Sequence, residues 1–464
     1  MEKRLLMLLA GIFTANFLFA QTSDDHYKKP LKQVLDEVQS RFDVTIRYSE
    51  ELVADRWVTY ADWRYRPDLE KTLNNILAPQ DLIFVKEGDK KYKLKNYEYY
   101  RWTPEDGREQ AEYLASLYED AVSWEKRKDE LKSCMWSALR LDHFPKWTDS
   151  APVTSNKRKM DGYVIENFAL ETLPGVYVCA SMYRPASLKR KVPVMLCPNG
   201  HFNEGRYHSQ QQYKCAMLAR LGIVAVSYDL FAWGESGLQF KQEYHRKSLA
   251  MTMQVLNTIR ILDYLLTLPS TDPSRTGITG GSGGGSHSML ITALDDRIKI
   301  SVPAVMLSCY MYGGCPCESG LPVHLCGNGT NNVELASMAA PRPQLIISDG
   351  KDWTANVPET EFPLVQRVYH FYGKSDQVKN VHFADEGHDY GLSKRIALYE
   401  FIALHMGLDI NAIKDKHGAI DESKITIEDE KAMYVFGPNG EKLPANAIKS
   451  FEELEKVFES VAEQ

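Results

Sequence analysis

The residues best suited to chemistry surround one serine in a glycine-rich run. Residues 279–285 read Thr-Gly-Gly-Ser-Gly-Gly-Gly and satisfy the pattern G-x-S-x-G, with Ser282 at its centre. A β-rich stretch precedes this run, and a helix-compatible segment, 288–294, follows it. A strand that turns so sharply into a helix needs neighbours without Cβ, and it places the serine hydroxyl above the edge of a sheet. The pattern predicts a nucleophilic serine; a flexible glycine-rich loop is the alternative.

A serine hydroxyl needs a base, and the base needs a carboxylate to orient it. In sheet enzymes with this turn, the order along the chain is serine, acid, histidine, each placed after a strand. Asp352 follows the strand predicted at 344–347, and His388 follows the one at 381–384. We therefore predict that Ser282, Asp352 and His388 are the catalytic residues. The weaker candidates are His382, which lies within a strand, and the acids Asp349, Glu359 and Glu334.

The oxyanion of an acyl-transfer intermediate needs two backbone N–H groups. The N–H of Gly283 supplies one, and the loop after the predicted strand at 192–197 supplies the other. That loop reads Pro-Asn-Gly-His-Phe-Asn-Glu-Gly-Arg, so we assign the second N–H to His201, with Phe202 as the alternative. This chemistry requires no metal and no cofactor, and none is expected.

Three residues near the predicted site have side chains suited to a sugar acid. Arg206 could bind a carboxylate bidentately, or form a surface ion pair with Glu204 or another acid. Trp233 and Trp353 lie on predicted loops and could stack on sugar rings, or simply pack. We predict that Arg206, Trp233 and Trp353 are substrate-binding residues.

The eight cysteines fall into two groups. Cys179 and Cys197 lie in apolar strand-like runs, which favours buried free thiols. A second group crowds a segment rich in Gly and Pro, and its spacing, C-x5-C-x-C-x8-C, matches no familiar zinc pattern. One or two disulfides bracing this loop are favoured over a metal site, with a pairing that the sequence leaves open; four free thiols are the other alternative. The members of this group are Cys309, Cys315, Cys317 and Cys326.

The first twenty residues have the features of a secretory signal. Lys3 and Arg4 precede an apolar run at 5–19, and a polar stretch begins at Gln21. The run is too short for a good membrane span, and no later window reaches 18 apolar residues. The sequence therefore predicts an exported protein without a membrane span; a buried N-terminal helix is the alternative.

Composition excludes several classes of function. Of 464 residues, 44% are hydrophobic, and 55 basic against 62 acidic side chains give a net charge of −7. These values are typical of a globular protein and exclude disorder and coiled coil. Because the chain has no basic patch to neutralise phosphates, nucleic acid and anionic membranes are excluded as expected partners.

Periodicity divides the chain into five segments. Residues 1–20 are the signal peptide, and 21–96 alternate two helical faces with short strands, as in a small α+β domain. Charged helices at 97–150 are interpreted as a helical linker. Strands and helices then alternate over 151–408, which predicts an α/β domain with a mostly parallel central sheet. Residues 409–464 are interpreted as a C-terminal extension.

Residues 30–95 resemble the secretin and TonB N-terminal short domain. The resemblance rests on a helix of the type L-x-x-V-L-x-x-V, a strand holding a Tyr, a second helix ending N-x-I-L, and a hairpin. It implies a periplasmic module of Gram-negative bacteria that binds a protein partner. An unrelated small α+β domain is the alternative.

Residues 161–407 resemble the α/β-hydrolase fold, and within it the carbohydrate esterases related to acetyl xylan esterases and dienelactone hydrolases. The motifs are the N-G-H loop, G-S-G-G-G at 281–285, G-G-C-P-C-E at 313–318, N-V-E at 332–334, D-W-T at 352–354 and G-H-D-Y at 387–390. The resemblance implies a serine esterase that acts on an esterified plant polysaccharide or oligosaccharide. Removal of methyl esters, as in pectin methylesterases, and removal of acetyl groups both remain open. A peptidase and a non-enzymatic interaction protein are the alternatives.

Overall fold

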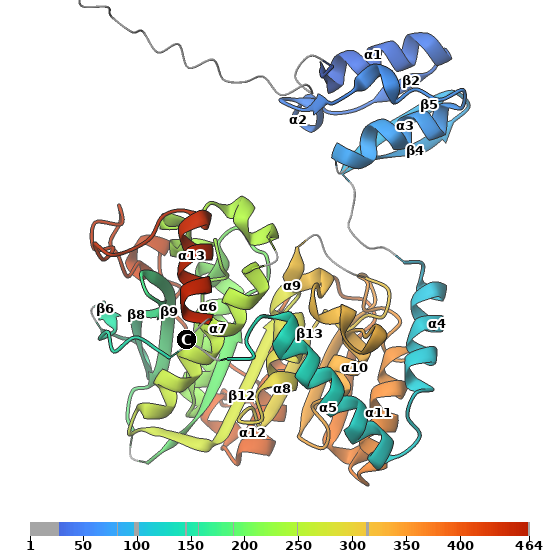
Figure 1. Cartoon of the computed structure of the whole chain (residues 1–464). Helices are drawn as coiled ribbons and strands as arrows, with labels where there is room; N and C mark the ends of the chain where they lie inside the picture. Colours follow the sequence, from blue (N-terminus) through green and yellow to red (C-terminus); the bar gives the residue numbers. More distant parts are fainter. Residues whose placement is uncertain are drawn as a thin grey trace, which may run out of the picture. The chain divides into compact units, whose positions relative to one another are not determined.

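The computed structural model describes residues 27–462, except 81, 97–101, 144–145, 156, 189, 248 and 312–314. The predicted signal peptide therefore lies outside the described residues. The chain forms two compact units, Met1–Glu98 and Tyr99–Gln464 (Figure 1). Among the described helices, none combines the length and the apolarity that crossing a bilayer requires.

The smaller unit is an α+β domain with its own core. Its helix α1 (Leu31–Phe42) buries the apolar face that the sequence predicted, and α3 (Leu69–Leu77) buries a second one. Both helices contribute to one cluster of buried side chains. The strands are β1 (Lys29–Pro30) with β3 (Trp57–Val58), and β2 (Thr45–Arg47), β5 (Lys91–Asn96) and β4 (Leu82–Gly88), with the short helix α2 (Glu50–Val53) between them.

The larger unit is built on one sheet with the order β15-β14-β13-β12-β10-β11-β9-β8-β6. The six strands from β15 to β11 are parallel, and an antiparallel hairpin extends the other edge. This arrangement confirms the prediction of a mostly parallel α/β sheet. The strands are β6 (Val153–Thr154), β7 (Arg158–Lys159), β8 (Tyr163–Leu173), β9 (Val176–Pro185), β10 (Val192–Pro198), β11 (Val224–Tyr228), β12 (Thr271–Gly281), β13 (Ile300–Ala304), β14 (Gln344–Asp349) and β15 (Val378–Phe383).

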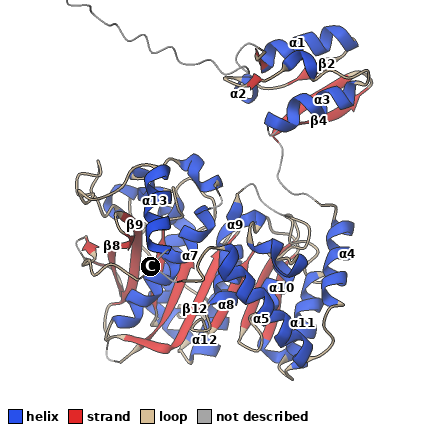
Figure 2. Cartoon of the chain, in the orientation of Figure 1, coloured by secondary structure: helices blue, strands red, loops and turns tan. Residues whose placement is uncertain are grey.

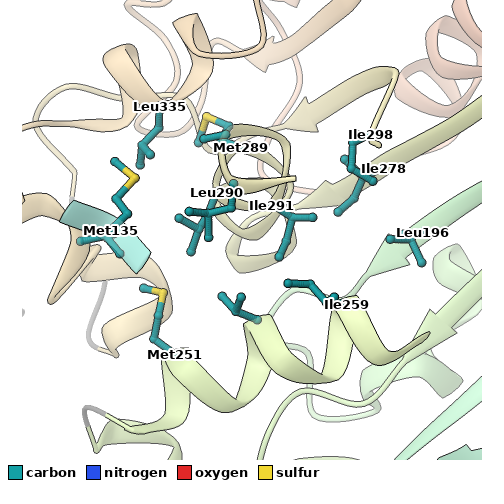
Figure 3. Close-up of a cluster of buried hydrophobic side chains, with 14 of the residues drawn as sticks. Met135, Leu196, Met251, Ile259, Ile278, Met289, Leu290, Ile291, Ile298 and Leu335 are labelled. Carbon is teal, nitrogen blue, oxygen red and sulfur yellow. The ribbon is translucent and has the colours of Figure 1, made fainter. Parts of the chain in front are cut away.

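Helices cover both faces of this sheet (Figure 2). Successive residues of β10 point to opposite faces, so Leu196 enters one buried cluster and Met195 enters the other. Figure 3 shows Leu290 of α8 (Gly283–Leu294) gathered with Met251 and Ile259 of α7 (Leu249–Thr267) in the first cluster. The other helices are α4 (Pro104–Ala115), α5 (Ala121–Ala138), α6 (Ser209–Leu221), α9 (Pro316–Ser319), α10 (Asn332–Ser337), α11 (Glu361–Phe371), α12 (Leu392–Met406) and α13 (Phe451–Ala462).

Two predicted segment boundaries differ from the structure. The segment 97–150 is not a linker, because α5 buries Trp124, Leu131 and Met135 in the core of the larger unit. The segment 409–464 is not a separate extension either, since α13 buries Phe451 and Phe458 in the same core. Both segments belong to the unit that contains the sheet.

Candidate active site

Ser282 lies at a sharp turn between β12 and α8. Its backbone has φ 56° and ψ −127°, a conformation that costs a residue with a side chain roughly 1–3 kcal/mol. Glycines make the turn possible, because a Cβ on Gly280 would lie 2.4 Å from the carbonyl oxygen of Gly284. A Cβ on Gly284 would lie 2.5 Å from the carbonyl oxygen of Pro198. The strand-to-helix turn predicted from the G-x-S-x-G pattern is therefore present.

The Ser282 side chain faces a small pocket at the carboxyl end of the sheet. The residue is 8% exposed, and its hydroxyl donates to Glu318 Oε1 at 3.3 Å. The same pocket is lined by His388 and by Gly200 of the loop after β10. A hydroxyl that shares a pocket with an imidazole can become a nucleophile once the imidazole accepts its proton.

Asp352 and His388 are in direct contact. His388 Nδ1 lies 2.6 Å from Asp352 Oδ2, and the backbone N–H and hydroxyl of Thr354 donate to the other carboxylate oxygen. Burial by itself raises the pKa of Asp352, but the hydrogen bonds from His388 and Thr354 lower it below its usual value. The carboxylate is thus held ionised, so it accepts a hydrogen bond from Nδ1–H of His388 and leaves the lone pair on Nε2.

The weaker candidates from the sequence lie in other environments. Glu334 is buried in an ion pair with Arg127, at 3.0 and 2.9 Å. His382 lies within β15, and its Nδ1 pairs with the hydroxyl of Ser348 on the neighbouring strand β14. Burial and the neighbouring Asp352 raise the pKa of Asp349 to about 6, so this carboxyl supports the acid rather than replacing it.

The loop after β10 approaches Ser282 closely. A Cβ on Gly200 would lie 3.2 Å from Ser282 Cβ, and the buried side chain of Asn199 donates to the carbonyl of Tyr228 at 2.7 Å. Among the described residues, no hydrogen bond to protein engages the backbone N–H of Gly283 or of His201. Both N–H groups fit the predicted oxyanion role, which remains a proposal.

The prediction that Arg206 binds substrate is wrong. Its side chain is fully buried, and its guanidinium donates to the carboxylates of Asp229, at 2.8 Å, and Glu235. It also donates to the hydroxyl of Ser181 and the carbonyl of Met433. Because its donors are engaged inside the protein, none reaches a ligand. The alternative was right that Arg206 forms an ion pair with an acid, but the pairs are buried rather than at the surface, and their acids, Asp229 and Glu235, come from the loop after β11.

The two tryptophans differ in what they contact. Trp353 packs on the ring of His388, with centroids 4.3 Å apart, so it supports the predicted base. Trp233 is half-buried and lines a second pocket together with His201 and the exposed Arg246. Both tryptophans are half-buried, and their predicted role in substrate binding stays a prediction.

Glu318 was not predicted as a site residue, although it lies in the G-G-C-P-C-E motif at 313–318. Glu318 Oε1 bridges the Ser282 hydroxyl and His201 Nδ1, at 3.3 and 2.9 Å. The only signal was the position of this acid beside two cysteines in a Gly- and Pro-rich segment.

The prediction of a disulfide within the segment 309–326 also differs from the structure. Cys326 pairs with Cys134 of α5, 192 residues away, whereas Cys309, Cys315 and Cys317 are buried thiols. Spacing along the chain could not indicate a partner so distant. Cys179 and Cys197 are buried free thiols, as predicted.

The parallel sheet, the strained serine after β12 and the acid and histidine after β14 and β15 define an α/β-hydrolase. The solved structure of Methylesterase BT1017 is 47% identical, covers 96% of this chain and 100% of its own, and has a TM-score of 0.76. The chain belongs to the same family as this methylesterase.

More distant solved structures match part of the chain. A Bacteroides fragilis NCTC 9343 protein described as a candidate acetyl xylan esterase is 19% identical and covers 58% of this chain and 78% of its own, with a TM-score of 0.45. A glucuronoyl esterase from Solibacter usitatus is 15% identical and covers 62% of this chain and 94% of its own, with a TM-score of 0.45. No protein-family model and no curated protein matches the sequence.

Proposed function

We propose that the chain is a serine carboxylester hydrolase that removes methyl esters from the uronic acids of a plant polysaccharide. The observation that carries this proposal is the strained Ser282 in a pocket shared with His388, whose other nitrogen contacts Asp352. The 47% identical relative, which bears the name methylesterase, supports the choice of a methyl ester over an acetyl ester.

In the proposed reaction, Ser282 Oγ attacks the ester carbonyl while His388 Nε2 accepts the hydroxyl proton. The N–H groups of Gly283 and His201 stabilise the oxyanion. His388 returns the proton to the methoxy oxygen, so methanol leaves and an acyl-enzyme remains. Water then attacks the acyl-enzyme with His388 as base, which releases the uronate carboxylate and restores the serine.

A pectin-like substrate carries free carboxylates beside its esters, so its binding favours a nearby cation. Arg246 is exposed in the pocket that His201 and Trp233 line, and His201 also contacts Gly283 of the predicted oxyanion hole. We assign to Arg246 the carboxylate-binding role that the buried Arg206 cannot perform, and to Trp233 the contact with a sugar ring.

The test incubates the purified protein with methylated pectin and with acetylated xylan, and measures the methanol and acetate released. We expect methanol from pectin, loss of this activity in Ser282→Ala, and a raised KM for pectin in Arg246→Ala with little change on a small aryl acetate. Full activity of Ser282→Ala would contradict the proposal. Release of acetate without methanol would indicate that the substrate is an acetyl ester rather than a methyl ester. Cleavage of peptides alone would favour a peptidase.

We also propose that the protein is exported to the periplasm or beyond, and that the smaller unit binds a protein partner. The signal-like residues 1–20 and the resemblance of residues 30–95 to the secretin and TonB N-terminal short domain support this proposal. The smaller unit has a separate core, so a chain that begins at Tyr99 should keep its hydrolytic activity. Loss of that activity would assign the smaller unit to the active site instead.

A further inference from the structure

Four metal-binding side chains converge beside the serine. His201 comes from the loop after β10, His245 from a short 3-10 helix (Gln242–Arg246), and Cys315 and Cys317 from the start of α9. One donor atom from each lies within 4.8 Å of all the others. Both sulfurs lie 3.3–3.4 Å from His201 Nε2, and Cys317 Sγ lies 3.3 Å from His245 Nε2. The active-site proposal assigns no role to His245 or to either thiol.

The hydrogen bonds of the two histidines direct their lone pairs toward one point. His201 Nδ1 lies 2.9 Å from the carboxylate of Glu318, and His245 Nδ1 lies 2.8 Å from the carbonyl of Phe231. A carboxylate and a carbonyl accept hydrogen bonds, so each Nδ1 carries the proton and each Nε2 presents a lone pair. The two Nε2 atoms nevertheless lie 2.9 Å apart. Two lone pairs at this separation repel each other, so either a proton on one Nε2 or a metal ion must lie between them.

The donor set identifies the cation. Two thiolates and two imidazoles are a tetrahedral zinc set, and histidine ligands that donate their other N–H to a carboxylate or a carbonyl are typical of such sites. Ligand distances of about 2.0–2.3 Å imply separations of about 3.3–3.8 Å between the donors of a tetrahedron. The three nitrogen–sulfur separations given above match this range, while the two sulfurs, 2.7 Å apart, and the two Nε2 atoms, 2.9 Å apart, would each move apart when the metal binds.

We propose that His201, His245, Cys315 and Cys317 bind one zinc ion. Two thiolates balance the charge of Zn²⁺, so the filled site is neutral, which suits a cluster in which only His201 is more than 9% exposed. Four protein ligands leave no open position, so the metal has a structural role. This proposal revises the sequence expectation that no metal is present.

The zinc would fix two groups that contact the serine turn. His201 lies against Gly283, since a Cβ on Gly283 would lie 2.5 Å from its ring, and it holds Glu318 through Nδ1. Glu318 in turn accepts from the Ser282 hydroxyl. The ion would therefore connect α9 to the loop after β10 and position the predicted oxyanion donor.

The test measures metal content, so it does not depend on the proposed hydrolysis. The full chain is produced with supplied Zn²⁺ and purified without chelator, and its zinc is measured by plasma mass spectrometry. We expect about one zinc per chain. After replacement by Co²⁺, we expect the strong visible bands of a tetrahedral site together with thiolate-to-cobalt charge transfer.

Matched variants locate the site. Cys317→Ser and His245→Ala should reduce bound zinc to a small fraction of one ion per chain. Cys215→Ala and His382→Ala, which alter a buried thiol and a histidine outside the cluster, should keep the wild-type content. The wild-type zinc content and cobalt spectrum decide the question even if a ligand variant fails to fold. Wild-type protein without zinc, unchanged zinc in Cys317→Ser, or a Cys315–Cys317 disulfide in unreduced protein would each overturn the proposal.

Discussion

At the scale of single residues, the backbone of Ser282 determines what its hydroxyl can reach. The turn at φ 56° lifts the side chain into a pocket lined also by His388, while Glu318 accepts the hydroxyl's hydrogen bond. In the proposed reaction the hydroxyl must turn from Glu318 to His388 Nε2 before it attacks. The base and its carboxylate are already aligned, since His388 Nδ1 contacts Asp352.

The two histidines near the end of β15 provide a matched test of this assignment. His388→Ala should lower kcat on the ester substrate on the order of 10³-fold, because it removes the general base. His382→Ala should leave kcat nearly unchanged, because His382 pairs with Ser348 inside the sheet. Steady-state kinetics of both variants, with circular dichroism as a check on folding, measures the difference. Equal losses in the two variants would refute the assignment of His388.

Residue types and chain order were enough to predict Ser282, Asp352 and His388 as candidates. The G-x-S-x-G pattern locates the turn, and the later strands locate the acid and the histidine. The environment of Arg206 was not predictable, because its acceptors lie 23 and 29 residues away and on a segment beyond residue 430. The cluster around His201 was missed for the same reason, since Glu318 and Cys315 lie 117 and 114 residues away.

At the scale of elements, the sequence predicted the strands β10, β14 and β15 to within three residues at each end. The run at 192–197 corresponds to β10 (Val192–Pro198), and the run at 344–347 corresponds to β14 (Gln344–Asp349). Strand ends were missed where polar residues continue the backbone pairing. The strand β12 begins at Thr271, which pairs with Val192 and lies five residues before the continuously buried part that starts at Thr276.

The helix that follows the serine turn carries a buried histidine whose titration should be measurable. His287 of α8 lies 2.7 Å from the hydroxyl of Thr258, and burial lowers its pKa from 6.5 to about 4. Above pH 6.5, neither the folded nor the unfolded state binds this proton, so protonation of His287 does not lower the free energy of unfolding. Between pH 6.5 and 4 only the unfolded state binds it, and stability falls.

His287→Gln should remove this pH dependence while it keeps a hydrogen bond to Thr258. We expect the free energy of unfolding of the wild type to fall between pH 7.5 and pH 5 by about 2 kcal/mol more than that of the variant. Urea unfolding at the two pH values measures both. Identical pH dependence in the two proteins would show that His287 does not titrate as its burial implies.

At the scale of the whole chain, the contacts of α5 explain why the predicted linker was wrong. The apolar spacing at 97–150 correctly indicated helices, but spacing alone cannot show what a helix packs against. In the structure, Arg127 of α5 forms a buried ion pair with Glu334, and Cys134 forms the disulfide with Cys326. A disulfide also fits the proposed export, because oxidising compartments preserve such bonds.

The disulfide between Cys134 and Cys326 should contribute strongly to the attachment of α5 to the segment 309–326. It closes a long loop, with a sequence separation of 192 residues, so its removal should destabilise the larger unit by about 2–4 kcal/mol. The double variant Cys134→Ala/Cys326→Ala should therefore unfold at a lower urea concentration than the wild type. The control variant Cys309→Ala, which alters a buried thiol outside this disulfide, should still lose stability when a phosphine reductant is added. The double variant should not respond to the reductant, because its bond is already absent. A wild-type midpoint that is insensitive to reduction would mean that α5 is held by its buried ion pair and apolar face alone.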